Sequence, residues 1–236
     1  MMWQMQWQFL NGCIIYFCIQ LGRCVSFSFP ALALILILRT TILKRAVFLR
    51  GMVWSIFLIV PFLGKLKLFY ENMLMCRFFM WWNNICIEYW QVRYGYMIGM
   101  MITASLIIWK HKKLHGLVSR MEKGRIDGQE IYINEMAVTP FTTGLIHVRT
   151  VVPKVMLQNC KPEELKVILC HERTHICLGH LWYYLLWDMV GVLLWINPFL
   201  AVCGRFFRED MEDICDRVTI QKSNETAYEY GMLLLK

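Results

Sequence analysis

Three residues in the second half of the chain have the types and spacing needed to hold a metal ion and activate water. Residues 170–175 read CHERTH, a His-Glu-x-x-His array in a stretch predicted to be helical from Pro162 onward. Side chains four apart on a helix share one face, so His171 and His175 can direct ring nitrogens at one ion. Zinc lowers the pKa of its water toward ~7, and Glu172 beside it can take the proton. The spacing favours a zinc peptidase over an ordinary helix surface.

Two histidines leave such a site one protein ligand short, because a peptidase zinc takes three protein ligands and keeps a fourth position open. Asn197-Pro198 is predicted to begin a helix whose stripe of charged residues includes Glu209, Glu212 and Asp216. Glu212 is the expected third ligand, with Asp216 one turn later as the carboxylate that orients a ligand histidine. Two alternatives remain: Glu209 is the ligand, or the stripe is a solvated face.

The composition is that of a membrane protein. Of 236 residues, 58% are hydrophobic and only 18% are charged. The net charge of +8 comes from Lys and Arg clustered beside apolar runs, which argues against nucleic-acid binding and for orientation in a bilayer. The 10 cysteines form no C-x-x-C pair, and Cys170 and Cys215 lie off the expected ligand face, which argues against thiolate coordination.

Residues 1–110 are predicted to form a membrane region with three transmembrane helices, at about 18–38, 46–64 and 94–109, and no cleaved signal peptide. Residues 65–93 are expected to be an external amphipathic loop. The basic connections after the first and third spans belong in the cytoplasm, which places everything after Lys110 there as well.

Residues 111–236 are predicted to be an α+β domain on the cytoplasmic side. A hydrophilic connection at 112–128 leads to strands near 131–133 and at 145–152, separated by a turn at 140–144. An edge strand here could bind an extended peptide, although a plain hairpin fits equally. A helix at about 181–195 is expected to be membrane-associated. The fold class is therefore a mainly α-helical membrane protein followed by a small α+β domain.

Several motifs in order along the chain resemble one family, the membrane zinc peptidases of the BlaR/MecR type, which are beta-lactam sensor-transducers of bacteria. They are the metal motif at 171–175, Trp195-x-Asn197-Pro198, and the segment 208–216 (REDMEDICD), with weaker matches near Trp54 and at 140–153. The similarity covers roughly residues 25–234.

The resemblance implies a gluzincin-like peptidase domain facing the cytoplasm of a multi-pass bacterial membrane protein. It implies one zinc ion held by His171, His175 and Glu212, with Glu172 as the base and Asp216 supporting a ligand. The implied partners are the bilayer and a peptide or protein substrate, and a homodimer is compatible with the sequence. The implied activity is self-cleavage, or cleavage of a transcriptional repressor, in the regulation of antibiotic resistance.

Two features depart from the family. Gly179-His180 stands where the family has a basic residue and an aspartate. The sequence ends at Lys236, before the fourth span and the extracellular penicillin-binding sensor of characterised members, so beta-lactam sensing is not assigned to this polypeptide. A truncated non-catalytic relative and a housekeeping membrane zinc protease are therefore the alternatives.

Overall fold

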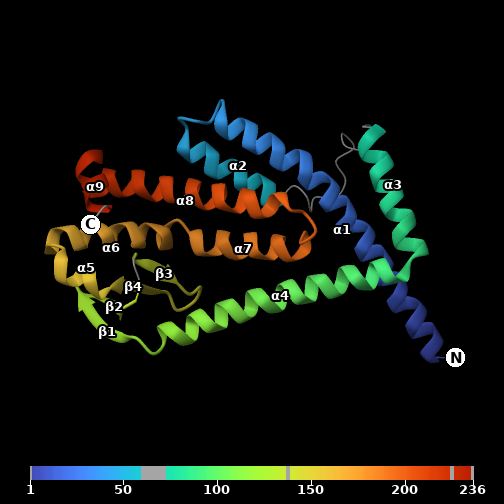
Figure 1. The fold of residues 1–236 in the computed structure, drawn as a ribbon, viewed down its shortest axis with the longest axis horizontal. Coiled ribbons are helices and arrows are strands. Elements are labelled where there is room, and N and C mark those ends of the chain that lie inside the picture. The colour runs from blue at the N-terminus through green and yellow to red at the C-terminus, as the bar shows by residue number, and fades with distance from the viewer. Residues whose placement is uncertain (1, 60–72, 137–138, 224–225, 235–236) are drawn as a thin grey trace. The chain divides into compact units, whose positions relative to one another are not determined.

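The computed structural model describes residues 2–59, 73–136, 139–223 and 226–234, and it is mainly helical with one small sheet (Figure 1). The helices are α1 (Met2–Thr40), α2 (Val47–Ile59), α3 (Met73–Glu88), α4 (Trp90–Val118), α5 (Lys154–Asn159), α6 (Pro162–Cys177), α7 (His180–Leu193), α8 (Phe199–Ser223) and α9 (Ala227–Leu234). The strands are β1 (Glu122–Ile126), β2 (Gln129–Asn134), β3 (Phe141–Thr143) and β4 (Arg149–Pro153).

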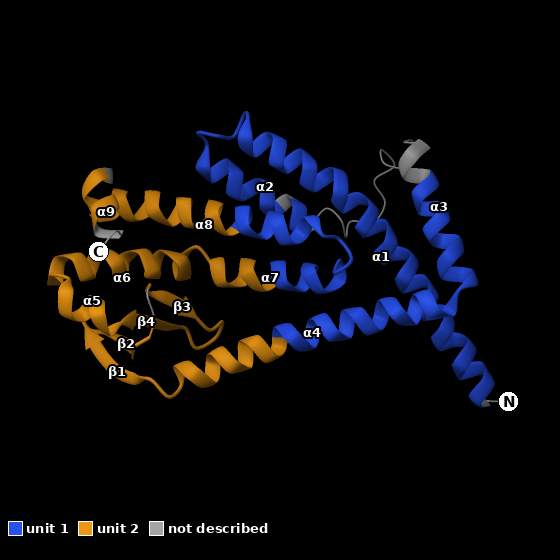
Figure 2. Cartoon of the chain, viewed as in Figure 1, with its two compact units in different colours: residues 1–107, 186–207 blue, residues 108–185, 208–236 orange. Residues whose placement is uncertain are grey.

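The chain divides into two compact units (Figure 2). The first comprises residues 1–107 and 186–207, and the second comprises 108–185 and 208–236. Residues 186–207, which were assigned to the second domain, belong with the first unit because their aromatic side chains pack there.

Two helices in the described part of the chain are long and apolar enough to cross a membrane, at 3–40 and 90–118. Both extend beyond the predicted spans of 18–38 and 94–109. The helices α6 and α7 meet the same criterion only as a bent pair. The second predicted span, 46–64, is helical as α2 over 47–59, and its remaining residues lie outside the described part of the chain.

Residues 73–88 are the helix α3, so the prediction of a loop over 65–93 is wrong there; residues 65–72 lie outside the described part. The charged residues of this segment suggested a loop, but Arg93 is only 5% exposed. Its guanidinium donates hydrogen bonds to the carbonyls of Cys86 (2.5 Å) and Ile87 (3.0 Å). These carbonyls belong to the last turn of α3, where helical partners are missing.

An aromatic cluster forms part of the core of the first unit. Trp187 stacks on Phe207 with ring centroids 4.7 Å apart, and Trp54 meets Trp187 edge-on at 5.5 Å. Asn197 begins α8 as expected, since its side-chain oxygen accepts a hydrogen bond from the Phe199 amide at 3.0 Å. Its amide group also donates to the Ser28 hydroxyl.

The second unit is organised around a four-stranded sheet in the order β1-β2-β4-β3. β1 and β2 form an antiparallel hairpin at Asp127 and Gly128, which both have positive φ, of 49° and 80°. β2 and β4 are parallel, and β3 pairs antiparallel with β4.

This sheet corrects three predictions. The connection 112–128 contains the end of α4 and the strand β1. The predicted turn at 140–144 contains β3, which is one of the two edge strands of this sheet, whereas β4 is central. The pair near 131–133 and 149–153 is parallel, so it is not a hairpin.

Alternate residues of the central strands face opposite layers. Ile131 and Val152 pack against Leu169 of α6, while Tyr132 and Val151 pack against Val118 at the end of α4. The sheet thereby supports the helix that carries the metal-binding motif, and β3 lies beside α6 (Figure 1).

Candidate metal centre

The residues at the N-terminus of α6 explain why the helix begins at Pro162. Pro162 occupies the first turn together with Glu163 and Glu164, whose charges suit the positive end of the helix dipole. The Glu164 carboxylate accepts a hydrogen bond from the Lys161 amide at 3.0 Å. With Leu169 packed on the sheet, the helix is fixed along the length that carries the motif.

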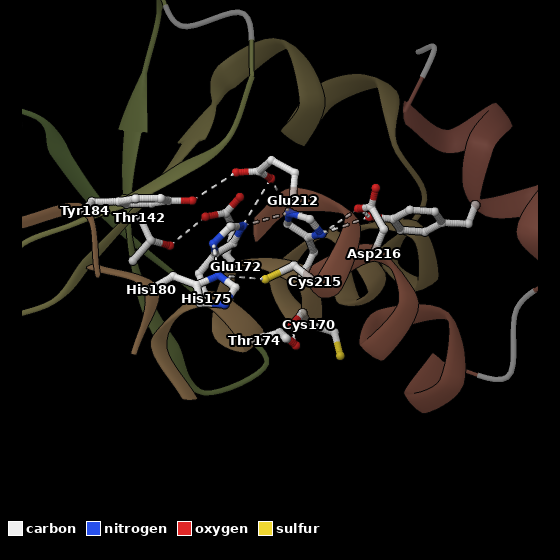
Figure 3. Close-up of polar contacts among 12 residues, drawn as sticks. Thr142, Cys170, Glu172, Thr174, His175, His180, Tyr184, Glu212, Cys215 and Asp216 are labelled. Carbon is white, nitrogen blue, oxygen red and sulfur yellow. Dashed lines mark hydrogen bonds and ion pairs between the residues drawn. The ribbon is translucent and has the colours of Figure 1, made fainter. Parts of the chain in front are cut away.

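The structure brings His171, His175 and Glu212 together in the second unit (Figure 3). Nε2 of His171 and Nε2 of His175 are 3.1 Å apart. Glu212 Oε2 lies 3.3 Å from His171 Nε2 and 3.2 Å from His175 Nε2. Bonds of about 2.0–2.1 Å at tetrahedral angles would separate zinc ligands by roughly 3.3 Å. Two imidazole nitrogens and a carboxylate oxygen are also a donor set that zinc accepts, so these residues fit the ion.

The charges around these residues favour a cation. Burial would raise the pKa of Glu212, but hydrogen bonds with His171 and His175 outweigh burial and hold that pKa well below its usual range. Burial would lower the pKa of His171, but Asp216 and then Glu212 raise it to about 9. The carboxylates thus stabilise positive charge here, whether a proton or a metal supplies it.

The outer nitrogen of His171 meets the residue expected to support a ligand. Its Nδ1 lies 3.1 Å from Asp216 Oδ1, and the Tyr230 hydroxyl donates to the same oxygen at 2.7 Å. Asp216 can therefore accept the Nδ1 proton of a neutral His171 whose Nε2 faces the metal. Tyr230 holds that carboxylate in place.

The general-base candidate is set apart from the ligands. Glu172 is only 5% exposed, and its Oε2 accepts a hydrogen bond of 2.6 Å from the Thr142 hydroxyl on β3. Burial raises the pKa of the Glu172 carboxyl despite that hydrogen bond and the nearby histidines. A raised pKa brings a carboxylate nearer the range in which it exchanges protons efficiently at neutral pH.

Several residues near the centre were missed from the sequence. These are Thr142, Tyr184 and Tyr230, whereas His180 was noted only as part of a departure from the family pattern. Tyr184 donates a long hydrogen bond, 3.4 Å, to Glu212 Oε1. No motif marked these residues, because each comes from another element and approaches only through folding.

Cys170 and Cys215 lie differently with respect to the ligand atoms, and Cys215 belongs to a second group of side chains that could hold a metal ion. Figure 3 shows the sulfur of Cys170 directed away from the ligand atoms. Cys215 is fully buried, and its Sγ lies 3.4 Å from His180 Nδ1, facing the outer side of the ligand set. The described part of the chain holds two potential metal-binding groups, one of His171, His175 and Glu212 and one of His175, His180 and Cys215. Glu209 belongs to neither.

Residues 82–236 match the family model described as BlaR1 peptidase M56, which is well over half of the chain and includes every residue of the site. The chain belongs to the BlaR1 peptidase M56 family. The resemblance inferred from the ordered motifs is thereby confirmed.

Curated relatives agree with this assignment. Methicillin resistance mecR1 proteins of Staphylococcus aureus and Staphylococcus epidermidis are each 28% identical to the chain over 98 residues. The matched region is 41% of this chain and 17% of each relative. The match covers so little of those proteins that the family assignment rests on the family model over residues 82–236.

Proposed function

We propose that this M56 family member is an integral-membrane zinc endopeptidase. The observation that carries the proposal is the convergence of His171, His175 and Glu212 within 3.1–3.3 Å of one another, with the buried Glu172 beside them. When bound, zinc would supply a Lewis acid that polarises a peptide carbonyl and activates water.

Side chains of the protein would carry out proton transfer and stabilise the oxyanion. Glu172 takes the proton of the attacking water and passes it to the leaving amine, with Thr142 orienting its carboxylate. Tyr184, a neutral phenol at physiological pH because tyrosine ionises near ~10, can donate to the developing oxyanion. The gluzincin type of site and a single zinc ion per chain belong to the same proposal.

The substrate would bind as an extended peptide along β3. This strand ends the sheet on one side, and its Thr142 contacts the base directly. Main-chain pairing at an edge strand holds peptides with little dependence on sequence. We propose the cytoplasmic face as the site of cleavage, with a transcriptional repressor or the chain itself as the substrate in regulated proteolysis.

The decisive experiment uses detergent-purified protein and the variant Glu172→Gln, which keeps the shape of the side chain and removes the base. Wild type should hold close to one zinc per chain and generate cleavage products in a proteome-wide comparison. The variant should retain zinc and lose those products. Wild type without zinc would refute the proposal. Identical products from the two proteins would instead favour a non-catalytic relative.

The same comparison separates regulated from housekeeping proteolysis. A regulatory enzyme should yield a few defined cleavage sites that depend on Glu172. A housekeeping protease would yield many sites, concentrated in destabilised membrane proteins.

A further inference from the structure

The outer nitrogen of the second histidine ligand faces another imidazole. Nδ1 of His175 lies 3.2 Å from Nδ1 of His180, and these side chains are among the most buried polar groups, with the residues 6% and 3% exposed. Their rings meet nearly edge-on, with centroids 5.1 Å apart. Among the residues that the structure describes, no carboxylate takes this place, in contrast to Asp216 beside His171.

The hydrogens of this pair follow from the chemistry of the ligand. A histidine that binds a metal through Nε2 is neutral and carries its proton on Nδ1. His175 must therefore donate from Nδ1, and the facing Nδ1 of His180 must accept. His180 is then neutral with its own proton on Nε2.

A break in the helix makes this contact possible. Residues five apart on a continuous α-helix differ by about 140° around the axis, so His180 would face away from His175. Gly179, with φ of +71°, instead ends the helical path of α6, and α7 starts at His180. The Gly179-His180 pair, which departs from the family pattern, thus brings the imidazole back to the ligand.

We propose that His180 is a positioning residue that accepts the Nδ1 proton of His175 and thereby fixes the tautomer and orientation of this zinc ligand. The inference rests on the proposed zinc site and adds a residue outside it. Cys215, with Sγ 3.4 Å from the same nitrogen, packs behind the pair as a neutral thiol.

Two substitutions separate hydrogen bonding from packing. In His180→Asn, the side-chain oxygen can occupy the place of Nδ1, two bonds from Cβ, and can accept the proton. In His180→Leu, a methyl group occupies that place. We expect a competition titration with a zinc chelator to show zinc binding about 10–100-fold weaker in the leucine variant, the usual scale for losing such support. The asparagine variant should stay within a few-fold of wild type.

The exposed His147 provides the matched control, and His147→Leu should leave zinc affinity unchanged. A spectrum of zinc-loaded wild type labelled with ¹⁵N-histidine tests the tautomers without any substitution. It should show the proton of His175 on Nδ1 and that of His180 on Nε2.

Several outcomes would overturn the inference. Wild-type affinity in His180→Leu, equal weakening in both variants, or a His180 proton on Nδ1 would each do so. A thiolate-to-metal charge-transfer band in the cobalt-substituted protein that vanishes in Cys215→Ser would show that His175, His180 and Cys215 bind an ion themselves. Wild type unable to bind zinc would refute the proposed function as well, whereas the other outcomes leave it standing.

Discussion

Glu212 is the proposed ligand whose assignment depends most on the fold, since its side chain is 51% exposed and comes from α8. It nevertheless meets both histidines, while Glu209, one turn earlier, joins neither potential metal-binding group in the described residues. We expect Glu212→Ala to abolish zinc retention, and Glu209→Ala to leave it nearly unchanged. Asp216→Ala should weaken zinc binding by about 10–100-fold.

A metal-competition titration of the three variants checks this ranking. Loss of zinc in Glu209→Ala with retention in Glu212→Ala would reassign the third ligand. Equal affinities for wild type and Asp216→Ala would remove the role given to Asp216.

Protons should compete with zinc at His171. Its pKa in the folded, metal-free protein is raised to about 9, above the ordinary 6.5. In the absence of metal, the stabilisation from its neighbouring carboxylates is therefore complete below pH 6.5 and lost as the pH rises through about 9. Zinc binding at pH 7 should release about one proton from this residue.

Calorimetric titrations in buffers of different ionisation enthalpy measure that release. Apparent zinc affinity should rise about tenfold per pH unit up to pH 9 and then level off. A pH-independent affinity between pH 7 and 9 would show that His171 is already neutral.

At the level of elements, the strand β3 links the edge of the sheet to the general base through Thr142. Thr142→Val keeps the shape but removes the hydroxyl that donates to Glu172. A hydrogen bond to a charged group contributes about 1.5–3 kcal/mol, so we expect kcat to fall roughly 10–100-fold while zinc content stays the same. Thr142→Ser should restore most of the activity in a peptide-cleavage assay, and a valine variant as active as wild type would exclude this role.

The helices around the site could be predicted because their signals are local. Pro162 with its acidic neighbours begins α6, and Asn197 caps α8. The sheet was harder to predict from the sequence than the helices. The parallel pairing of β2 with β4 depends on packing against α6 and α4, which no local pattern encodes.

One missed feature did have a sequence signal. Asp127-Gly128 is a typical two-residue hairpin turn, but charged residues on both sides made the segment look like a connection. β3 has only three residues, too few for a pattern of alternating burial. Thr142 was missed and no contact was predicted for His180, because the roles of both residues come from contacts across the fold.

At the scale of the whole molecule, the expected orientation can be tested with cysteines introduced at exposed positions in a cysteine-free background. Asn84 on α3 and Gln158 on α5 are both exposed. The distribution of Lys and Arg predicts that Asn84→Cys reacts with an impermeant thiol reagent in intact cells, and that Gln158→Cys reacts only after lysis. The reverse pattern would exclude an intracellular substrate.

The separation of 41 positions between His171 and Glu212 along the chain gives a bound ion a mechanical role. Zinc held by both would be a cross-link between α6 and the middle of α8, and its binding energy would oppose local opening of the second half of α8. We expect chelation to speed amide hydrogen exchange over residues 208–223, while the β1–β2 hairpin, which carries no ligand, exchanges as before. A peptidase built in this way would lose the order of its C-terminal helices together with its metal, and starvation for zinc would expose that end of the chain to other proteases.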